Sequence, residues 1–287
     1  MRNRFFSIYR LWLAGCLALL PASQAQAQRV GIAIDGNLTA GAEYVAGQAD
    51  KPAVLILHGF LQTAEFPIIR QLTQHLAGEG YTVLAPTLTL GITGRRQSLP
   101  CEAINAHTMQ GTAKEIAVWM RWLQKRRPKV ILVGHSFGTV YLLNYLEESH
   151  DPAVTKLVGI STVEGGLSMV DSPRRQALLE KLRRQAANPK PTLVRQAFAF
   201  CRQYQSTPQG LLSYLEWSPE RIIASIERQP TRLAFIMGSA DDRLGPDWIG
   251  RLQATPARVH VIKGANHFMD GQYEFDMLER LLDELKN

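Results

Sequence analysis

The sequence predicts an α/β fold in which a mostly parallel central sheet is flanked by helices. Short apolar runs bounded by Gly or Pro recur along the chain, as expected of strands buried on both faces. Segments with apolar residues at helical spacing lie between these runs, and such alternation is typical of a parallel sheet covered by helices. The six runs are residues 52–57, 81–85, 130–133, 157–160, 233–237 and 259–262.

The other elements also follow from residue spacing. Ahead of the first run, residues 30–34 and 42–46 predict an N-terminal β-hairpin. Residues 116–123 carry apolar side chains at positions i, i+3, i+4 and i+7, which predicts an amphipathic helix. Residues 275–285 repeat that spacing and predict the last helix.

The composition excludes several classes of protein. The 287 residues are 46% hydrophobic and 20% charged, which is too apolar for a disordered chain. Three cysteines are too few for a scaffold built on disulfides. The net charge of +7 would suit a nucleic-acid partner, but the start of the chain argues against one.

The first 27 residues have the order of a secretory signal peptide. Arg2, Arg4 and Arg10 precede an uncharged apolar stretch at residues 11–20, and Ala-Gln-Ala at 25–27 is a small-residue cleavage pattern. The stretch is shorter than the ~20 residues that span a bilayer. We therefore predict cleavage after Ala27, a periplasmic or secreted location and no nucleic-acid partner. Lipoprotein processing at Cys16 is the alternative, disfavoured because the apolar stretch continues past it.

Residues 28–287 are predicted to form one domain, with a core of residues 28–164 and 229–287 and a cap between them. The cap, residues 165–228, is predicted to be a helical insertion, and nothing in it predicts a strand. Ser218 is a favourable N-cap before Pro219 in the last of its helices. The four predicted helices are residues 174–185, 192–203, 209–217 and 219–227.

The cap is strongly basic. Between Pro173 and Tyr204 it holds eight Lys or Arg residues, with Glu180 as the one acid. Two interpretations stay open. The charges form either a solvated face or a surface that contacts anionic lipid headgroups or acidic envelope polymers.

Residues 134–138 read Gly-His-Ser-Phe-Gly, directly after a predicted strand and before an apolar helix. This is the context in which Gly-x-Ser-x-Gly forms a nucleophile elbow. The turn exposes the Ser136 hydroxyl, and the helix N-terminus places amide donors beside a developing oxyanion. We therefore predict that Ser136 is a nucleophile.

On these residues the chain resembles the α/β-hydrolase family over nearly all of the segment after the signal peptide. The resemblance implies that His267, after the last strand, is the base of a triad with Ser136. It implies that Asp241, after residues 233–237, is the acid, with Asp242 and Glu164 as alternatives.

The same resemblance places the oxyanion hole at two backbone amides, those of Phe60 and Phe137. The expected activity is that of an exported serine hydrolase that cleaves small or medium carboxylic esters through an acyl-enzyme. The alternatives are a lipase or thioesterase with a longer acyl pocket, and a non-catalytic binding protein on a hydrolase scaffold. No metal or nucleotide motif is visible in the sequence, so no cofactor or metal is expected.

Cys101 and Cys201 are the two cysteines that would remain after cleavage. Because an exported protein enters an oxidising compartment, this pair predicts a disulfide. Cys101 follows the strand at residues 81–85 and Cys201 lies in the cap, so the bond would tie the cap to the core. Closing a loop of this length would stabilise the fold by about 4 kcal/mol.

Overall fold

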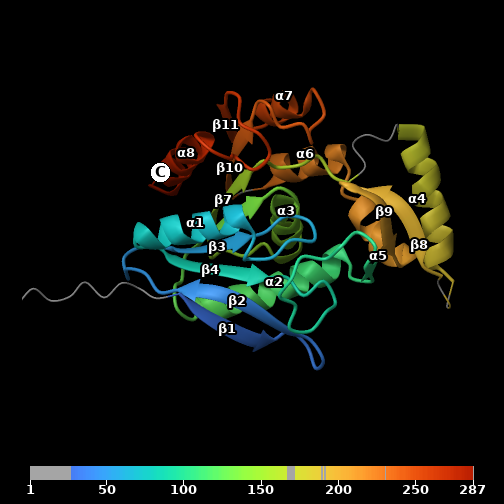
Figure 1. Ribbon diagram of the computed structural model, residues 1–287, viewed down its shortest axis with the longest axis horizontal. Coiled ribbons are helices and arrows are strands. Elements are labelled where there is room, and N and C mark those ends of the chain that lie inside the picture. The colour runs from blue at the N-terminus through green and yellow to red at the C-terminus, as the bar shows by residue number, and fades with distance from the viewer. Residues whose placement is uncertain (1–26, 167–171, 189, 191, 230, 287) are drawn as a thin grey trace, which may run out of the picture.

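An eight-stranded sheet forms the centre of the computed structural model, which describes residues 27–166, 172–188, 190, 192–229 and 231–286 (Figure 1). Strands β1 and β2 pair antiparallel, as do β2 and β4, and every other neighbouring pair in the sheet is parallel. The predicted mostly parallel sheet is therefore confirmed. In spatial order the strands are β1 (Gln28–Ala33), β2 (Thr39–Val45), β4 (Thr82–Thr87), β3 (Ala53–Leu57), β6 (Val130–His135), β7 (Val154–Ile160), β10 (Arg232–Gly238) and β11 (Arg258–Ile262).

The predicted signal peptide, residues 1–27, falls almost entirely outside the described residues, as does Cys16. Cleavage and lipoprotein processing therefore stay predictions. Within the described part of the chain, no helix is both long and apolar enough to cross a membrane.

Helices cover both faces of the sheet because alternate side chains of each buried strand point to opposite sides. In β3, Val54 and Ile56 pack in one apolar cluster, whereas Leu55 and Leu57 pack in the other. The first cluster is closed by α1 (Pro67–Gly78) and α8 (Tyr273–Lys286). The second is closed by α2 (Met109–Gln124), α3 (Phe137–Ser149) and α7 (Trp248–Gln253).

The order of the strands creates a switch point. Strand β3 lies between β4 and β6, so the chain leaves β3 toward one edge of the sheet and later returns on its other side at β6. Ligands of open α/β sheets bind at such points, beyond the carboxyl ends of the strands. Phe60 follows β3 and Ser136 follows β6, and both therefore lie at this position.

The cap is not purely helical, so the predicted all-helical insertion is wrong at one place. Residues 192–203, predicted as a helix, contain β8 (Val194–Phe198) and form a hairpin with β9 (Cys201–Ser206), turning at Ala199 with a positive φ of 51°. Side chains of β8 alternate between more and less buried, which is the period of a strand. The other predicted cap helices are observed as α4 (Ser172–Ala186), α5 (Pro208–Leu215) and α6 (Pro219–Arg228).

The hairpin is stabilised by partners that are distant in sequence. Strand β9 pairs in parallel with β5 (Ile104–Asn105), a short strand in the long segment after β4. Beside this pair a disulfide joins Cys101 to Cys201 across 100 positions of sequence. These contacts override the helical spacing of the apolar residues in 192–203, because β propensity depends mainly on neighbours across the sheet.

Candidate active site

Ser136 occupies a strained turn between β6 and α3. Its φ of 57° and ψ of −126° lie outside the regions that non-glycine residues prefer. The turn also requires Gly138, since a Cβ there would lie 2.6 Å from the Leu57 carbonyl oxygen and 2.7 Å from that of His58. The Gly-x-Ser-x-Gly segment thus folds as the sequence predicts, with helix α3 starting directly after Ser136.

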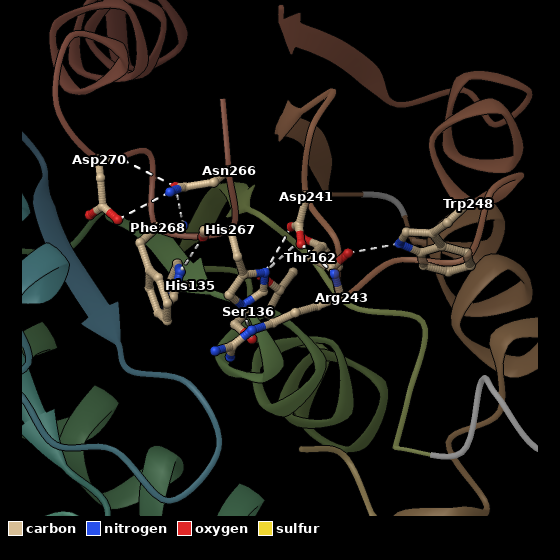
Figure 2. Close-up of polar contacts among 11 residues, drawn as sticks. His135, Ser136, Thr162, Asp241, Arg243, Trp248, Asn266, His267, Phe268 and Asp270 are labelled. Carbon is tan, nitrogen blue, oxygen red and sulfur yellow. Dashed lines mark hydrogen bonds and ion pairs between the residues drawn. The ribbon is translucent and has the colours of Figure 1, made fainter. Parts of the chain in front are cut away.

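Three predicted site residues meet in one hydrogen-bonded line (Figure 2). The Ser136 Oγ atom lies 3.0 Å from His267 Nε2, and His267 Nδ1 lies 2.7 Å from Asp241 Oδ2. All three are buried, with His267 only 2% exposed. With Nδ1 donating to the carboxylate, Nε2 is free to accept the proton of the Ser136 hydroxyl.

The loop that carries His267 is held from two sides. The Asn266 side chain accepts hydrogen bonds from the amides of Phe268 and Asp270 and donates to the Asp270 carboxylate. From beneath, His135 Nε2 donates to the His267 carbonyl at 3.1 Å. Burial, reinforced by the nearby His267 ring, lowers the pKa of His135 to about 3, so His135 stays neutral and acts only as this donor.

Hydrogen bonds in and around the loop after β10 show which of the three candidate acids contacts His267. Asp241 bonds His267 through one oxygen and accepts the Arg243 backbone amide at 3.0 Å through the other. Asp242 is exposed, and its carboxylate has no bond to His267 in the described structure. Glu164 is buried and accepts the Gly245 amide at 2.8 Å, so it supports the loop from below instead of facing the histidine.

The turn after β3 lies directly against the elbow. A Cβ added to Gly59 would be 3.2 Å from the Ser136 Cβ. The Gln62 side chain closes the turn by accepting the Gly59 amide, and Leu61 adopts a positive φ of 59°. The amide of Phe137 occupies the first position of α3, where the helix itself cannot use it. Phe60 and Phe137 therefore both lie around Ser136, as predicted for the two oxyanion residues.

A pocket of about 280 Å³ opens beside Ser136. Its walls are largely aromatic, because Phe60 and Phe137 from the core meet Phe198 and Phe200 from the cap hairpin. Asp242 and Arg243 lie at its border. The arrangement offers a nucleophile, a base and an apolar recess of the size of a small or medium acyl group.

The family model for the alpha/beta hydrolase family matches residues 54–275, which include the elbow, the acid loop and the histidine loop. The chain belongs to the alpha/beta hydrolase family. This hydrolase holds no group of three or more His, Cys, Asp or Glu side chains suited to a metal ion, within the residues that the structure describes.

Solved structures share the fold of the hydrolase at low sequence identity. The alpha/beta hydrolase GrgF from Penicillium sp. sh18 is 16% identical, with 91% of this chain and 98% of that chain covered and a TM-score of 0.68. The monoacylglycerol lipase of Paleococcus ferrophilus is 18% identical over 91% of this chain and 98% of its own, with a TM-score of 0.64. Est1E from Butyrivibrio proteoclasticus with ferulic acid bound is 15% identical over 89% and 98%, with a TM-score of 0.63.

A curated relative matches a shorter part of the hydrolase. Medium-chain fatty acid ethyl ester synthase/esterase 2 from Saccharomyces cerevisiae is 32% identical over 106 residues. The match covers 36% of this chain and 22% of the length of the yeast protein.

Sequence reasoning missed Arg95, a buried arginine that supports the turn after β3. Its guanidinium donates to the carbonyls of Leu61 and Gln62 in that turn and to those of Leu88 and Gln97 outside it. Burial lowers the pKa of Arg95 to about 10, so it remains charged at neutral pH. Nothing in the residue pattern around position 95 distinguishes it from a surface arginine.

Arg95 also lies beside His58, the residue at the end of β3. His58 Nδ1 donates to the Gly59 carbonyl, and Nε2 accepts the Leu88 amide. Burial, reinforced by the Arg95 charge, lowers the pKa of His58 to about 3, so this histidine is neutral. Its role is to fix the backbone of the turn, which agrees with the predicted use of a backbone amide, that of Phe60, in the oxyanion hole.

The aromatic residues of the cap hairpin were also missed as pocket walls. The spacing of residues 192–203 predicts a helix for Phe198 and Phe200, and their place beside Ser136 follows only from the hairpin. The alternation along β8 is one of burial in the folded hairpin, and the sequence Val-Arg-Gln-Ala-Phe at residues 194–198 has no matching alternation of apolar and polar residues that could have revealed them.

Proposed function

We propose that this alpha/beta hydrolase cleaves carboxylic esters through a triad of Ser136, His267 and Asp241. One observation carries the proposal: His267 bridges the hydroxyl of a strained serine and a buried carboxylate at hydrogen-bond distance on both sides. A binding protein on the same scaffold has no need of a strained serine aligned with an oriented base.

In the first half of the reaction, His267 Nε2 accepts the proton as Ser136 Oγ attacks the carbonyl carbon of the ester. Asp241 stabilises the resulting imidazolium and keeps Nδ1 protonated. The oxyanion receives the amides of Phe60 and Phe137, and the positive end of α3 adds to their effect. As the tetrahedral intermediate collapses, the C–O bond breaks and His267 gives its proton to the departing alcohol.

The second half repeats the chemistry with water. His267 removes a proton from a water molecule that attacks the acyl-enzyme, and the proton then returns to Ser136 Oγ as the carboxylic acid leaves. The buried acid and the neutral His135 beneath the loop keep His267 oriented throughout both halves.

Small or medium acyl groups are the substrates that the pocket supports best, because its volume is about 280 Å³ and its far wall is the cap hairpin. The printed names of similar proteins include a medium-chain ester synthase/esterase and a monoacylglycerol lipase, which is consistent with ester chemistry. A lipase or thioesterase with a longer acyl pocket is the alternative. Values of kcat/KM over p-nitrophenyl esters of increasing length should peak at short or medium chains, and a continued rise at long chains would favour the alternative.

Labelling by a fluorophosphonate tests the enzyme proposal directly. We expect the native protein to be labelled and Ser136→Ala to remain unlabelled with its fold intact by circular dichroism. Ser149→Ala, at the end of the same helix α3, is the matched control and should label normally. Absence of labelling in the native protein, or labelling that survives Ser136→Ala, would favour the binding-protein alternative.

We also propose that the protein is exported and that residues 1–27 are removed. The Cys101–Cys201 disulfide supports this, because such bonds persist in oxidising compartments. Intact mass and N-terminal sequencing of the protein from its native host should give a mature chain that begins at Gln28. A lipidated cysteine at position 16 would support the lipoprotein route, and an intact N-terminus would contradict export by cleavage.

A contact between the basic cap and anionic envelope lipid is part of the same proposal. Helix α4 lies at the outer edge of the cap (Figure 1), and its residues Lys181, Arg183 and Arg184 are exposed. Cosedimentation with vesicles that contain anionic lipid should exceed that with neutral vesicles and should fall in Lys181→Glu/Arg184→Glu. Equal sedimentation with both kinds of vesicle would leave the charges as a solvated face.

A further inference from the structure

The Arg243 side chain reaches from the acid loop toward the nucleophile. In Figure 2 it runs past the triad toward Ser136, and both residues line the same pocket. Its guanidinium carbon lies 4.7 Å from the ring centroid of Phe268, next to the catalytic histidine, and 5.7 Å from that of Phe200 in the cap. Two aromatic rings thus hold a cation at the border of the pocket.

This guanidinium has no carboxylate partner within the described part of the chain. Two arginines on cap helix α6 differ in this respect, since Arg221 and Arg228 both pair with Glu147. Asp242 is adjacent to Arg243 in sequence and also borders the pocket, yet no ion pair joins the two side chains. Arg243 is therefore an exposed positive charge at the border of the pocket, and its hydrogen-bond donors are available to a ligand.

The apolar lining of the pocket indicates which kind of substrate group this charge would bind. Phe60, Phe137 and Phe198 form an apolar wall that would penalise a charged substrate group. A guanidinium against such a wall compensates that penalty for an anion, and it binds carboxylates through paired donors.

We propose that Arg243 is a specificity-determining residue that binds an anionic group, such as a carboxylate, carried by the ester substrate. The inference rests on the proposed ester hydrolysis and narrows its substrate class. Because Arg243 and Ser136 line the same pocket, the anionic group and the scissile ester of one substrate would occupy that pocket together.

Two pairs of esters with equal chain length test the inference. Monomethyl adipate is compared with methyl hexanoate, which places the anion on the acyl half. The 6-acetoxyhexanoate anion is compared with hexyl acetate, which places it on the alcohol half. Acid release in a pH-stat gives kcat/KM for each ester after subtraction of spontaneous hydrolysis, and the ratio within a pair removes general losses of activity.

We expect the charged ester to be preferred by about tenfold in at least one pair, and this preference to weaken as salt is added. Arg243→Met should remove the preference, and Arg243→Lys should retain part of it. The matched control is Arg202→Met, because Arg202 is an exposed arginine on β9 that does not line the pocket. In that variant the ratio should be unchanged.

Several outcomes would overturn the inference. One is that the native protein hydrolyses the charged and the neutral ester of each pair with the same kcat/KM. Another is a preference for the charged ester that survives Arg243→Met. The third is that Arg202→Met loses the preference as fully as Arg243→Met, which would assign the effect to the electrostatic field of the whole cap. If methyl hexanoate and hexyl acetate are hydrolysed without a charge preference, only this inference fails. If no ester is hydrolysed and fluorophosphonate does not label Ser136, the proposed function fails and this inference fails with it.

Discussion

The ring of Phe60 packs edge-on against the ring of Phe198, with centroids 5.2 Å apart. Phe60 belongs to the turn after β3, and Phe198 belongs to the cap hairpin. Phe60 also contacts the ring of Tyr204 in the same hairpin and that of Tyr214 on α5. The cap therefore holds the side chain of the residue whose amide we assign to the oxyanion hole.

Replacing Phe198 by Ala should both destabilise the fold and slow catalysis. The side chain is 1% exposed, and removal of a buried Phe costs about 3–5 kcal/mol. We expect kcat/KM for a neutral short-chain ester to fall by about tenfold at a temperature where the variant is still folded. Phe275→Ala, which changes a side chain that is 76% exposed on α8, should alter neither quantity. Full activity in a folded Phe198→Ala protein would contradict the proposal that the cap holds the turn after β3 in its active position.

Asp241→Asn should lower kcat by about a thousandfold or more, because an amide no longer fixes the His267 tautomer or stabilises the imidazolium. Asp242→Asn should cause a much smaller loss, since that side chain is exposed. Steady-state kinetics of the two purified variants on one ester decides between them. A larger loss in Asp242→Asn would reverse the assignment of the acid.

Arg95→Met should lower kcat by about ten- to a hundredfold with KM changed by less than about threefold. The variant leaves the buried carbonyls of the turn after β3 without their donor, and a displaced oxyanion amide costs transition-state binding alone. Arg95→Lys should recover part of kcat. A rise in KM with kcat unchanged would show that Arg95 shapes the substrate pocket instead of positioning the turn.

Removal of the disulfide should lower the free energy of unfolding by about 4 kcal/mol, because the bond closes a loop across 100 sequence positions. Urea unfolding of Cys101→Ser/Cys201→Ser and of the native protein with reductant should give the same decrease. Reductant should have no effect on the double variant. An unchanged midpoint in all samples would show that the cap is held by packing alone.

Glu284 should make stability depend on pH in the acid range. Burial opposes its ionisation, but hydrogen bonds from His260, Lys156 and Arg258 outweigh burial and hold the pKa of Glu284 below its ordinary value of 4.5. A carboxyl group whose pKa is lower in the folded state stabilises the fold above the unfolded-state pKa. This stabilisation is lost as pH falls through the folded-state pKa.

Glu284→Gln should therefore reduce the free energy of unfolding by about 3 kcal/mol at neutral pH, where it leaves Lys156 buried without its partner charge. The difference from the native protein should shrink below pH 4.5. Glu279→Gln, an exposed position on the same helix, is the control and should show no such difference. A difference that persists unchanged in acid would exclude the ion pair as its source.

Much of the fold could be predicted because local signals agreed with tertiary structure. The buried runs at residues 52–57 and 130–133 are apolar on both faces, and no other environment in a folded domain suits them as well. The elbow at Ser136 combined a strand, a glycine pair and a helix within a few residues. These features depend on near neighbours, so they are visible in one sequence.

The cap hairpin and the support of the turn after β3 could not be predicted for the opposite reason. Residues 192–203 have apolar side chains at helical spacing, and their strand pairing depends on Ile104 and Asn105, which lie far away in sequence. The supporting role of Arg95 depends on hydrogen bonds to carbonyl groups of several segments. Contacts of this kind leave no periodic pattern.

The parallel pairing of β5 with β9 has a consequence for how such a cap could be exchanged between relatives. Residues 165–228 do not contain all of the cap sheet, because one of its two edge strands, β5, and one cysteine of its disulfide come from the segment around Cys101. A chimaera that swaps only the contiguous insertion would break both connections. The transferable unit is discontinuous: it has to include residues 99–106 together with the insertion.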